Sequence, residues 1–301
     1  RIRGTTTTTL ASTTSTLTLT NAIVQPSDKV VCTLTATDAD GGSSSSSASV
    51  LVQNTNPTVD SVQITPNSGI EADSALSCSA TASDDDGGTP TLSFTWLEGS
   101  TVIGSGTTIT LDPTAIAVGD TITCKVAASD ANGGGDIDFA SVTVENSDPI
   151  IVTHTITPNS GIATGTRLTC AATATDINGG TIGLTYRWFN VTTSTVLGSG
   201  ASYTVSSADV SPSDVIRCRA TATDTDSGTT ISDVDVTTTN LPPVIDSIAV
   251  SSSESTGESY NDSTLTCTAT SSDPDGGTPT LSYEWTNGTA VLGTGATLTL
   301  T

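Results

Sequence analysis

Apolar and polar residues alternate along this chain in short runs that are separated by turns. Alternation with a period of two predicts strands, because successive side chains of a strand point to opposite faces of a sheet. In residues 121–128, for example, Ile122, Cys124 and Val126 fall on one face. Between positions 57 and 146 the pattern predicts seven strands, at residues 58–64, 75–82, 92–96, 101–103, 107–111, 121–128 and 137–144. Seven short strands joined by turns favour a Greek-key sandwich over a barrel.

A cysteine returns every 46 to 49 residues and opens the same short pattern each time. Each one is followed six positions later by an aspartate, and then by a turn that contains glycine. The six cysteines are Cys32, Cys78, Cys124, Cys170, Cys218 and Cys267. A unit that repeats at a fixed period indicates an array of similar domains.

Tryptophan shows that the true repeat is two cysteines long. It lies eighteen residues after every second cysteine, at Trp96, Trp188 and Trp285. This repeat predicts two complete domains, at 57–146 and 149–240. Residues 1–56 match only the later strands of a domain, and residues 243–301 match only the earlier ones. We therefore expect a processed chain, or a segment of a longer one, that starts and ends inside a domain.

Three short linkers join the predicted domains, and each ends in proline. They span residues 54–57, 146–149 and 240–243. Proline restricts its own φ angle and pushes the preceding residue toward an extended conformation. We expect such linkers to be stiff, so that the domains are arranged as an end-to-end rod.

Composition narrows the class of protein. Threonine is abundant, and its branched side chain is favoured in strands, so an all-β chain is predicted. The formal charge is −23 with only eight lysine and arginine residues, which argues against nucleic acid and anionic lipid as partners. No apolar run approaches the roughly 18 residues that span a bilayer, so membrane insertion is not expected. Six cysteines at matched spacing indicate disulfides and hence an extracellular, cell-surface location.

The order Cys, Trp, Cys in an all-β pattern resembles the immunoglobulin-like superfamily. The segment 272–285, Ser-Asp-Pro-Asp-Gly-Gly-Thr-Pro-Thr-Leu-Ser-Tyr-Glu-Trp, is similar to the tandem Ig-like, PKD-like and cadherin-like repeats of large bacterial surface proteins. Antibody domains carry a tyrosine two residues before the second cysteine, but Val30, Ile122 and Ile216 stand there. The resemblance therefore implies the broad group, a tandem array of Greek-key immunoglobulin-like sandwiches, and no subfamily.

The resemblance also implies one disulfide inside each complete domain, beneath its tryptophan. Cys78 is expected to bond Cys124, and Cys170 is expected to bond Cys218. Closing a loop of that length stabilises a fold by about 4 kcal/mol in the chain-entropy model. The disulfides are expected to compensate for a core with few aromatic residues.

The turns after the cysteines carry a dense set of oxygen ligands. We expect both turns of a domain to emerge at the pole that receives the incoming linker, near Asn56 in one domain and near Asp148 in the next. Calcium prefers six to eight oxygens from carboxylates, amides and carbonyls. The candidate ligands are Asp84, Asp86, Asp130, Asn132, Asp136, Asp176, Asn178, Asp224, Asp226, Asp273 and Asp275. The alternative is turn chemistry alone, because Asp, Asn and Gly favour tight turns, and no cofactor is then required.

Catalysis is not expected. His154 is the only histidine, and its alternating strand at 150–156 suggests an ordinary surface position. Every cysteine inside a complete domain has an expected partner, which removes a thiol nucleophile. An aromatic content of 3% leaves little for a sugar-binding platform. Three sites, at Asn190, Asn261 and Asn287, match the N-glycosylation pattern, which a threonine-rich chain also produces by chance.

Two functions remain open on the sequence. The first is a structural repeat segment of an extracellular fibre, stalk or surface filament, whose partners are neighbouring copies of the chain. The second is the stalk of a cell-surface adhesin whose ligand-binding tip lies outside this segment. A further hypothesis is head-to-tail assembly, in which Cys32 of one copy bonds Cys267 of another. The simpler expectation is that each of these cysteines pairs with one beyond the segment.

Overall fold

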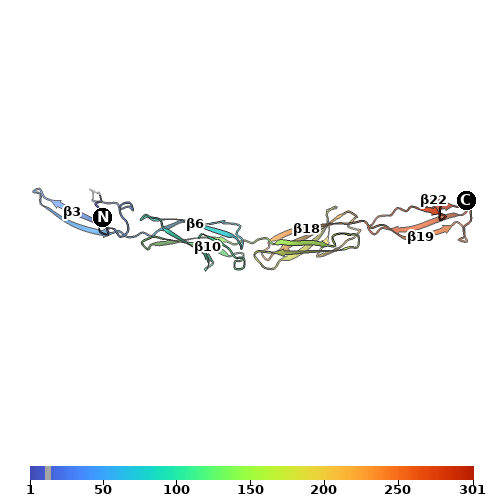
Figure 1. Cartoon of the computed structure of the whole chain (residues 1–301), viewed down its shortest axis with the longest axis horizontal. Helices are drawn as coiled ribbons and strands as arrows, with labels where there is room; N and C mark the ends of the chain where they lie inside the picture. Colours follow the sequence, from blue (N-terminus) through green and yellow to red (C-terminus); the bar gives the residue numbers. More distant parts are fainter. Residues whose placement is uncertain (11–14) are drawn as a thin grey trace. The chain divides into compact units, whose positions relative to one another are not determined.

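The computed structural model describes residues 1–10 and 15–301, and these residues divide into two compact units. One unit contains residues 1–147 and 177–179, and the other contains residues 148–176 and 180–301. Figure 1 shows that the regular elements are strands, which confirms the all-β prediction. In the described part of the chain, no helix is long and apolar enough to cross a membrane.

The first unit contains a complete two-sheet sandwich. Its strands are β5 (Thr58–Thr65), β6 (Ala75–Ser83), β7 (Thr91–Glu98), β8 (Thr101–Ser105), β9 (Thr108–Thr110), β10 (Thr121–Ser129) and β11 (Gly135–Thr143). One antiparallel sheet has the order β5-β6-β9, and the other has the order β11-β10-β7-β8. Each strand overlaps one of the seven that the alternation predicts. The two cysteine strands, β6 and β10, lie in different sheets.

Alternation decides which side chains fill this sandwich. In β10, Ile122, Cys124 and Val126 are fully buried, and the side chains between them are half-buried. Trp96 of β7 belongs to the same core and is also fully buried. Its indole N–H donates to the carbonyl of Gly106 at 3.0 Å, so that the buried ring keeps a partner for its polar atom. Aliphatic side chains around one tryptophan therefore make the core.

The second unit contains a sandwich with the same strand order. Its strands are β12 (Ile150–Thr157), β13 (Arg167–Thr175), β14 (Gly183–Asn190), β15 (Thr195–Ser199), β16 (Ser202–Thr204), β17 (Val215–Thr223) and β18 (Thr229–Thr237). The sheets have the orders β12-β13-β16 and β15-β14-β17-β18. Trp188 takes the place of Trp96, is fully buried, and donates its indole N–H to the carbonyl of Gly200 at 2.9 Å. The two sandwiches therefore share one architecture.

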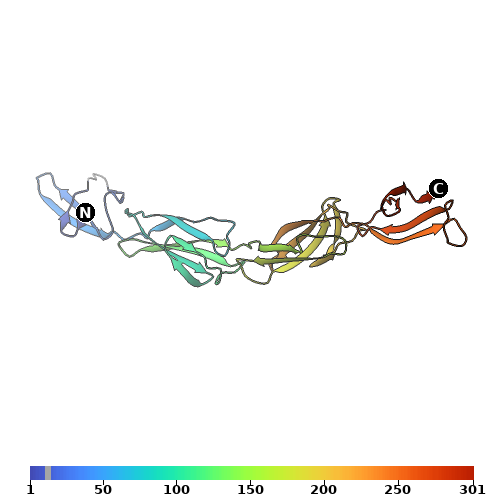
Figure 2. The same cartoon turned by 45° about the vertical axis from the view of Figure 1, so that its right-hand side comes forward.

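Strands also form in the two end segments, whose long hairpins Figure 2 shows in blue and orange. One sheet consists of β1 (Ile2–Arg3), β2 (Thr6–Thr7), β3 (Lys29–Thr37) and β4 (Ser43–Leu51). The other segment holds β19 (Val244–Ser252), β20 (Thr264–Ser272) and β23 (Thr297–Thr299), with the pair β21 (Glu284–Thr286) and β22 (Val291–Thr294). Leu34 of β3 is 74% exposed, whereas its counterpart Val126 is buried. Val250 of β19 is 59% exposed, whereas its counterpart Ile64 is buried.

Candidate functional site

Two disulfides join the sheets of the complete sandwiches. Cys78 of β6 bonds Cys124 of β10, and Cys170 of β13 bonds Cys218 of β17. These are the pairings that the resemblance implies. All four cysteines are buried, and each second cysteine is paired in register with the tryptophan of its own domain. Disulfide and indole thus form the centre of each core.

Cys32 and Cys267 are free thiols in the end segments. Cys32 lies on β3 and is exposed, and Cys267 lies on β20 and is half-buried. Both occupy register positions at which the complete sandwiches have a bonded cysteine. Their pairing, in a longer chain or with another copy, stays a prediction.

The first aspartate of a turn stabilises that turn by accepting hydrogen bonds from its backbone N–H groups. After β10, Asp130 Oδ1 accepts hydrogen bonds from the backbone N–H groups of Asn132 and Gly134, both at 2.8 Å. After β6, Asp84 Oδ1 accepts the backbone N–H of Asp86 at 2.9 Å. The same bond recurs at Asp38, Asp224 and Asp273. Turn chemistry therefore accounts for the aspartates at these positions.

A second set of turn carboxylates binds the linker in front of the first unit's sandwich. Asp86 accepts the backbone N–H of Thr55. Asp130 Oδ2 accepts an N–H of the Asn54 amide at 2.9 Å. Asp136 Oδ2 accepts the backbone N–H of Val59, near the start of β5, over a distance of 2.9 Å. The turns of both sheets therefore meet at the linker, and we call this set of contacts the linker junction.

Asp130 lies at the centre of the linker junction. The hydrogen bond from Asn54 is the main cause that holds the pKa of the Asp130 carboxyl below its ordinary value, against the opposing effect of burial. A Cβ on Gly134 would lie 2.5 Å from Asp130 Oδ2 and 2.7 Å from Asn56 Oδ1, so only glycine permits this close approach. Asn54 Oδ1 is buried and has no hydrogen-bond partner among the residues described.

The second unit has a linker junction of the same kind before its C-terminal segment. Asp275 accepts the backbone N–H of Leu241, and its other carboxylate oxygen accepts the Thr164 hydroxyl at 2.8 Å. The Leu241 bond is the chief cause of a lowered pKa for the Asp275 carboxyl, which burial opposes. In the linker before the second sandwich, Asp148 Oδ1 accepts the backbone N–H of Thr229 at 3.1 Å. Linker and turn are therefore joined by carboxylates in both units.

The remaining candidate ligands lie in the turns that follow β13 and β17. Asn178 Oδ1 accepts the backbone N–H of Ser147 at 2.9 Å, and both residues belong to the first unit. Asp176 precedes Asn178 in its turn. Asp226 lies in the turn that Asp224 fastens and donates its own backbone N–H to that carboxylate at 2.8 Å.

Calcium binding by these turns stays a prediction. Within residues 1–10 and 15–301, one set of three His, Cys, Asp or Glu ligand atoms lies within 4.8 Å of one another, at His154, Cys170 and Cys218. Two of these atoms are the sulfurs of one disulfide, and a metal binds thiolate rather than disulfide sulfur. The turn carboxylates accept N–H groups of turns and linkers.

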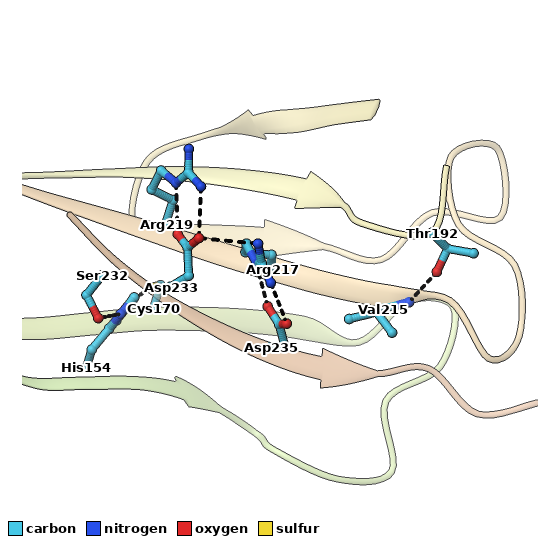
Figure 3. A network of polar contacts seen from close by, with 9 residues as sticks. All are labelled: His154, Cys170, Thr192, Val215, Arg217, Arg219, Ser232, Asp233 and Asp235. Carbon is cyan, nitrogen blue, oxygen red and sulfur yellow. Dashed lines mark hydrogen bonds and ion pairs between the residues drawn. The ribbon is translucent and has the colours of Figure 1, made fainter. Parts of the chain in front are cut away.

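His154 does not lie at the ordinary surface position that was predicted from its alternating strand. It lies half-buried on β12, with Nε2 3.2 Å from Cys170 Sγ and Nδ1 3.0 Å from Ser232 Oγ (Figure 3). A register shift earlier in β12 precedes it, and it is in phase with the buried Ile156. Burial lowers the pKa of the imidazole, and the charge of Asp233 opposes this.

The outer face of the same sandwich carries ion pairs that the sequence analysis missed. Arg217 of β17 binds Asp235 of β18 through two hydrogen bonds of 2.8 Å, and Arg219 binds Asp233 in the same way (Figure 3). Asp235 raises the pKa of Arg217 above its ordinary value. The signal in the sequence is an Arg-X-Arg pattern on one strand and an Asp-X-Asp pattern on the next. Residues two apart on a strand point to the same face, so both arginines can lie opposite the two aspartates. These pairs fasten β17 to β18.

No family model matches this chain, and no curated protein matches it. Among solved structures it is similar to three N-terminal domains of the outer capsid protein Hoc of bacteriophage RB49, at 15% identity over 70% of this chain and 78% of that chain, with a TM-score of 0.29. It is similar to a tetra-tandem repeat in the extending region of a large adhesion protein, at 15% identity over 82% of this chain and 64% of that chain, with a TM-score of 0.29. For protocadherin gamma B2 extracellular cadherin domains 3–6 the identity is 15% over 72% of this chain and 59% of that chain, with a TM-score of 0.28. The chain thus spans less than two thirds of the length of the last two.

The class of protein follows from the chain's own strand order, cross-sheet disulfides and buried tryptophans. Two sandwiches with sheets of three and four strands follow one another, each with one disulfide between its sheets. The chain is a tandem array of immunoglobulin-like β-sandwich domains.

Proposed function

We propose that this chain is a structural repeat segment of an extracellular fibre, stalk or surface filament, in which the domains stack end to end. The linker junction is the observation that carries the proposal. Asp130 binds the Asn54 amide in one unit, and Asp275 binds the Leu241 backbone in the other. Polar contacts between a linker and the pole of the next domain restrict bending at the linker. A fibre requires this stiffness, whereas a flexible tether does not.

The disulfides support an extracellular role. Each complete sandwich has one buried bond between its two sheets, closing loops of 46 and 48 residues. Such bonds persist in oxidising surroundings. They stabilise a small domain by restricting its unfolded state. A repeat unit outside the cell benefits from this added stability.

Neighbouring copies of the chain are the partners that this function requires. A stalk that only projects a binding tip has the same domains but needs no lateral contact between chains. The formal charge of −23 makes close lateral packing dependent on salt or cations, because like charges repel across unscreened distances.

Electron microscopy of native surface material from the source cells tests the proposal. We expect beads spaced by about 40 Å, the length of one sandwich of such strands with its linker, in bundled or helically ordered filaments. Single, unbundled stalks with a distinct tip favour an adhesin stalk instead. Surface material without beaded structures contradicts both.

A further inference from the structure

At one inward position beside the disulfides, the two complete sandwiches carry side chains of different chemistry. Val62 of β5 and His154 of β12 occupy the same place, two residues before the isoleucine that pairs in register with the first cysteine. Val62 packs against the apolar core of its sandwich. His154 instead brings Nε2 to 3.2 Å from Cys170 Sγ. One disulfide therefore has an imidazole against its sulfur and the other has an isopropyl group in that place.

We propose that His154 makes Cys170–Cys218 the more easily reduced of the two disulfides at equilibrium, although both bonds are buried. In the oxidised protein the sulfur beside His154 is neutral and a weak hydrogen-bond acceptor. After reduction, the Cys170 thiolate carries a full charge and pairs with the imidazolium. A neighbouring His⁺ lowers the pKa of a thiol, and an interaction that stabilises only the reduced form makes the bond more oxidising.

The groups around His154 favour this arrangement. Ser232 of β18 binds Nδ1 at 3.0 Å and so directs Nε2 toward the sulfur of β13 (Figure 3). Burial is the main cause that lowers the pKa of the imidazole, and the charge of Asp233 opposes burial by favouring the imidazolium. Asp233 is in turn held by Arg219 and Arg217 on β17. On β17, Cys218 Sγ lies within 4.8 Å of an imidazole nitrogen, while β12 has a threonine on either side of the histidine.

The exchange reaction balances with an external dithiol as the reductant. One dithiol thiolate attacks the disulfide, the Cys170–Cys218 bond breaks, and its electron pair passes to a cysteine sulfur. The second dithiol group then cleaves the mixed disulfide and closes the dithiol to its cyclic disulfide. The protein gains two electrons and two protons, and one of these protons is shared between Cys170 and His154.

Equilibration of the whole chain in dithiol redox buffers tests the proposal. Trapping of free thiols by alkylation, followed by peptide mass spectrometry, gives the reduced fraction of each bond separately. We expect His154→Val to make reduction of Cys170–Cys218 about tenfold less favourable, which is about 30 mV for this two-electron couple. Val62→His, which transplants the imidazole, should make reduction of Cys78–Cys124 more favourable by a similar factor.

A second measurement separates this effect from a change in packing. Thiolate absorbance of the reduced chain, titrated with pH, should show one thiol that ionises well below the ordinary cysteine value of about 8.5. His154→Val should return this thiol to the ordinary range, while tryptophan fluorescence reports that the reduced domain stays folded. Unchanged redox equilibria in both variants, or a titration that His154→Val leaves unaltered, overturn the proposal.

Discussion

Asp130 shows how one residue serves both local and longer-range order. Its Oδ1 atom fastens the turn after β10, and its Oδ2 atom holds Asn54 of the linker. A carboxylate has enough acceptor sites for both tasks, and a hydrogen bond to its charged form is stronger than one between neutral groups. The turn residue and the linker residue are therefore coupled through a single side chain.

We predict that Asp130→Asn lowers stability at neutral pH and flattens its acid dependence. The pKa of Asp130 is lower in the folded protein than its ordinary value of 3.8. Its contribution is therefore fully present above the unfolded value and is lost as the pH falls through the lowered folded value. Thermal unfolding between pH 7 and pH 2, a range of about five units chosen to cover both values, measures this. Asp85→Asn, at an exposed position in a neighbouring turn, is the matched control and should leave the acid limb intact.

The strand is the element that this sequence predicts best. In β10 and β17 every second residue is buried and apolar, so alternation places the strands and their inner faces correctly. The prediction for His154 was wrong because alternation shows which residues share one face of a strand, but it does not show which of the two faces is buried. The ion pairs of β17 and β18 were missed because they depend on which strand pairs with which, and in what register.

The linker junction combines predictable and unpredictable parts. That turns and linker meet at one pole follows from strand direction in a sandwich. The bond from Asn54 to Asp130 does not, because it depends on side-chain conformations and on the close approach that Gly134 allows. Turn propensity explains why an aspartate stands at position 130, and tertiary contact explains what its second oxygen does.

Removal of a disulfide should be costly to one sandwich and neutral to the other. For Cys78→Ala combined with Cys124→Ala we expect the free energy of unfolding of that sandwich to fall by about 4 kcal/mol, since the loop of 46 residues regains its freedom when unfolded. Hydrogen exchange measured by mass spectrometry in rising urea resolves the two sandwiches. Equal loss of protection in residues 149–240 would show that the two do not fold independently.

At the scale of the whole molecule, one plan recurs in both units. Each unit holds a complete sandwich whose core contains a disulfide and one buried tryptophan. Each also holds an end segment and a linker that turn carboxylates bind.

Calcium binding is a prediction for the whole molecule, because it concerns every linker. If the oxygens of the linker junctions bind calcium, millimolar calcium should raise the unfolding temperature of the chain. Asp136→Asn should remove part of the increase, because it takes a charge from the first unit's junction. Differential scanning calorimetry with and without a chelator measures both. An unfolding temperature that calcium leaves unchanged, with magnesium as the control ion, leaves turn chemistry as the full explanation.

Immunogold electron microscopy of intact source cells tests the central claim most directly. An antibody raised against residues 57–240, which hold both complete sandwiches, should label structures outside the cell at regular intervals along beaded filaments. Permeabilisation should add little further label. Label that appears only after permeabilisation, or that lies at single points without any filament, contradicts an extracellular fibre built from this chain.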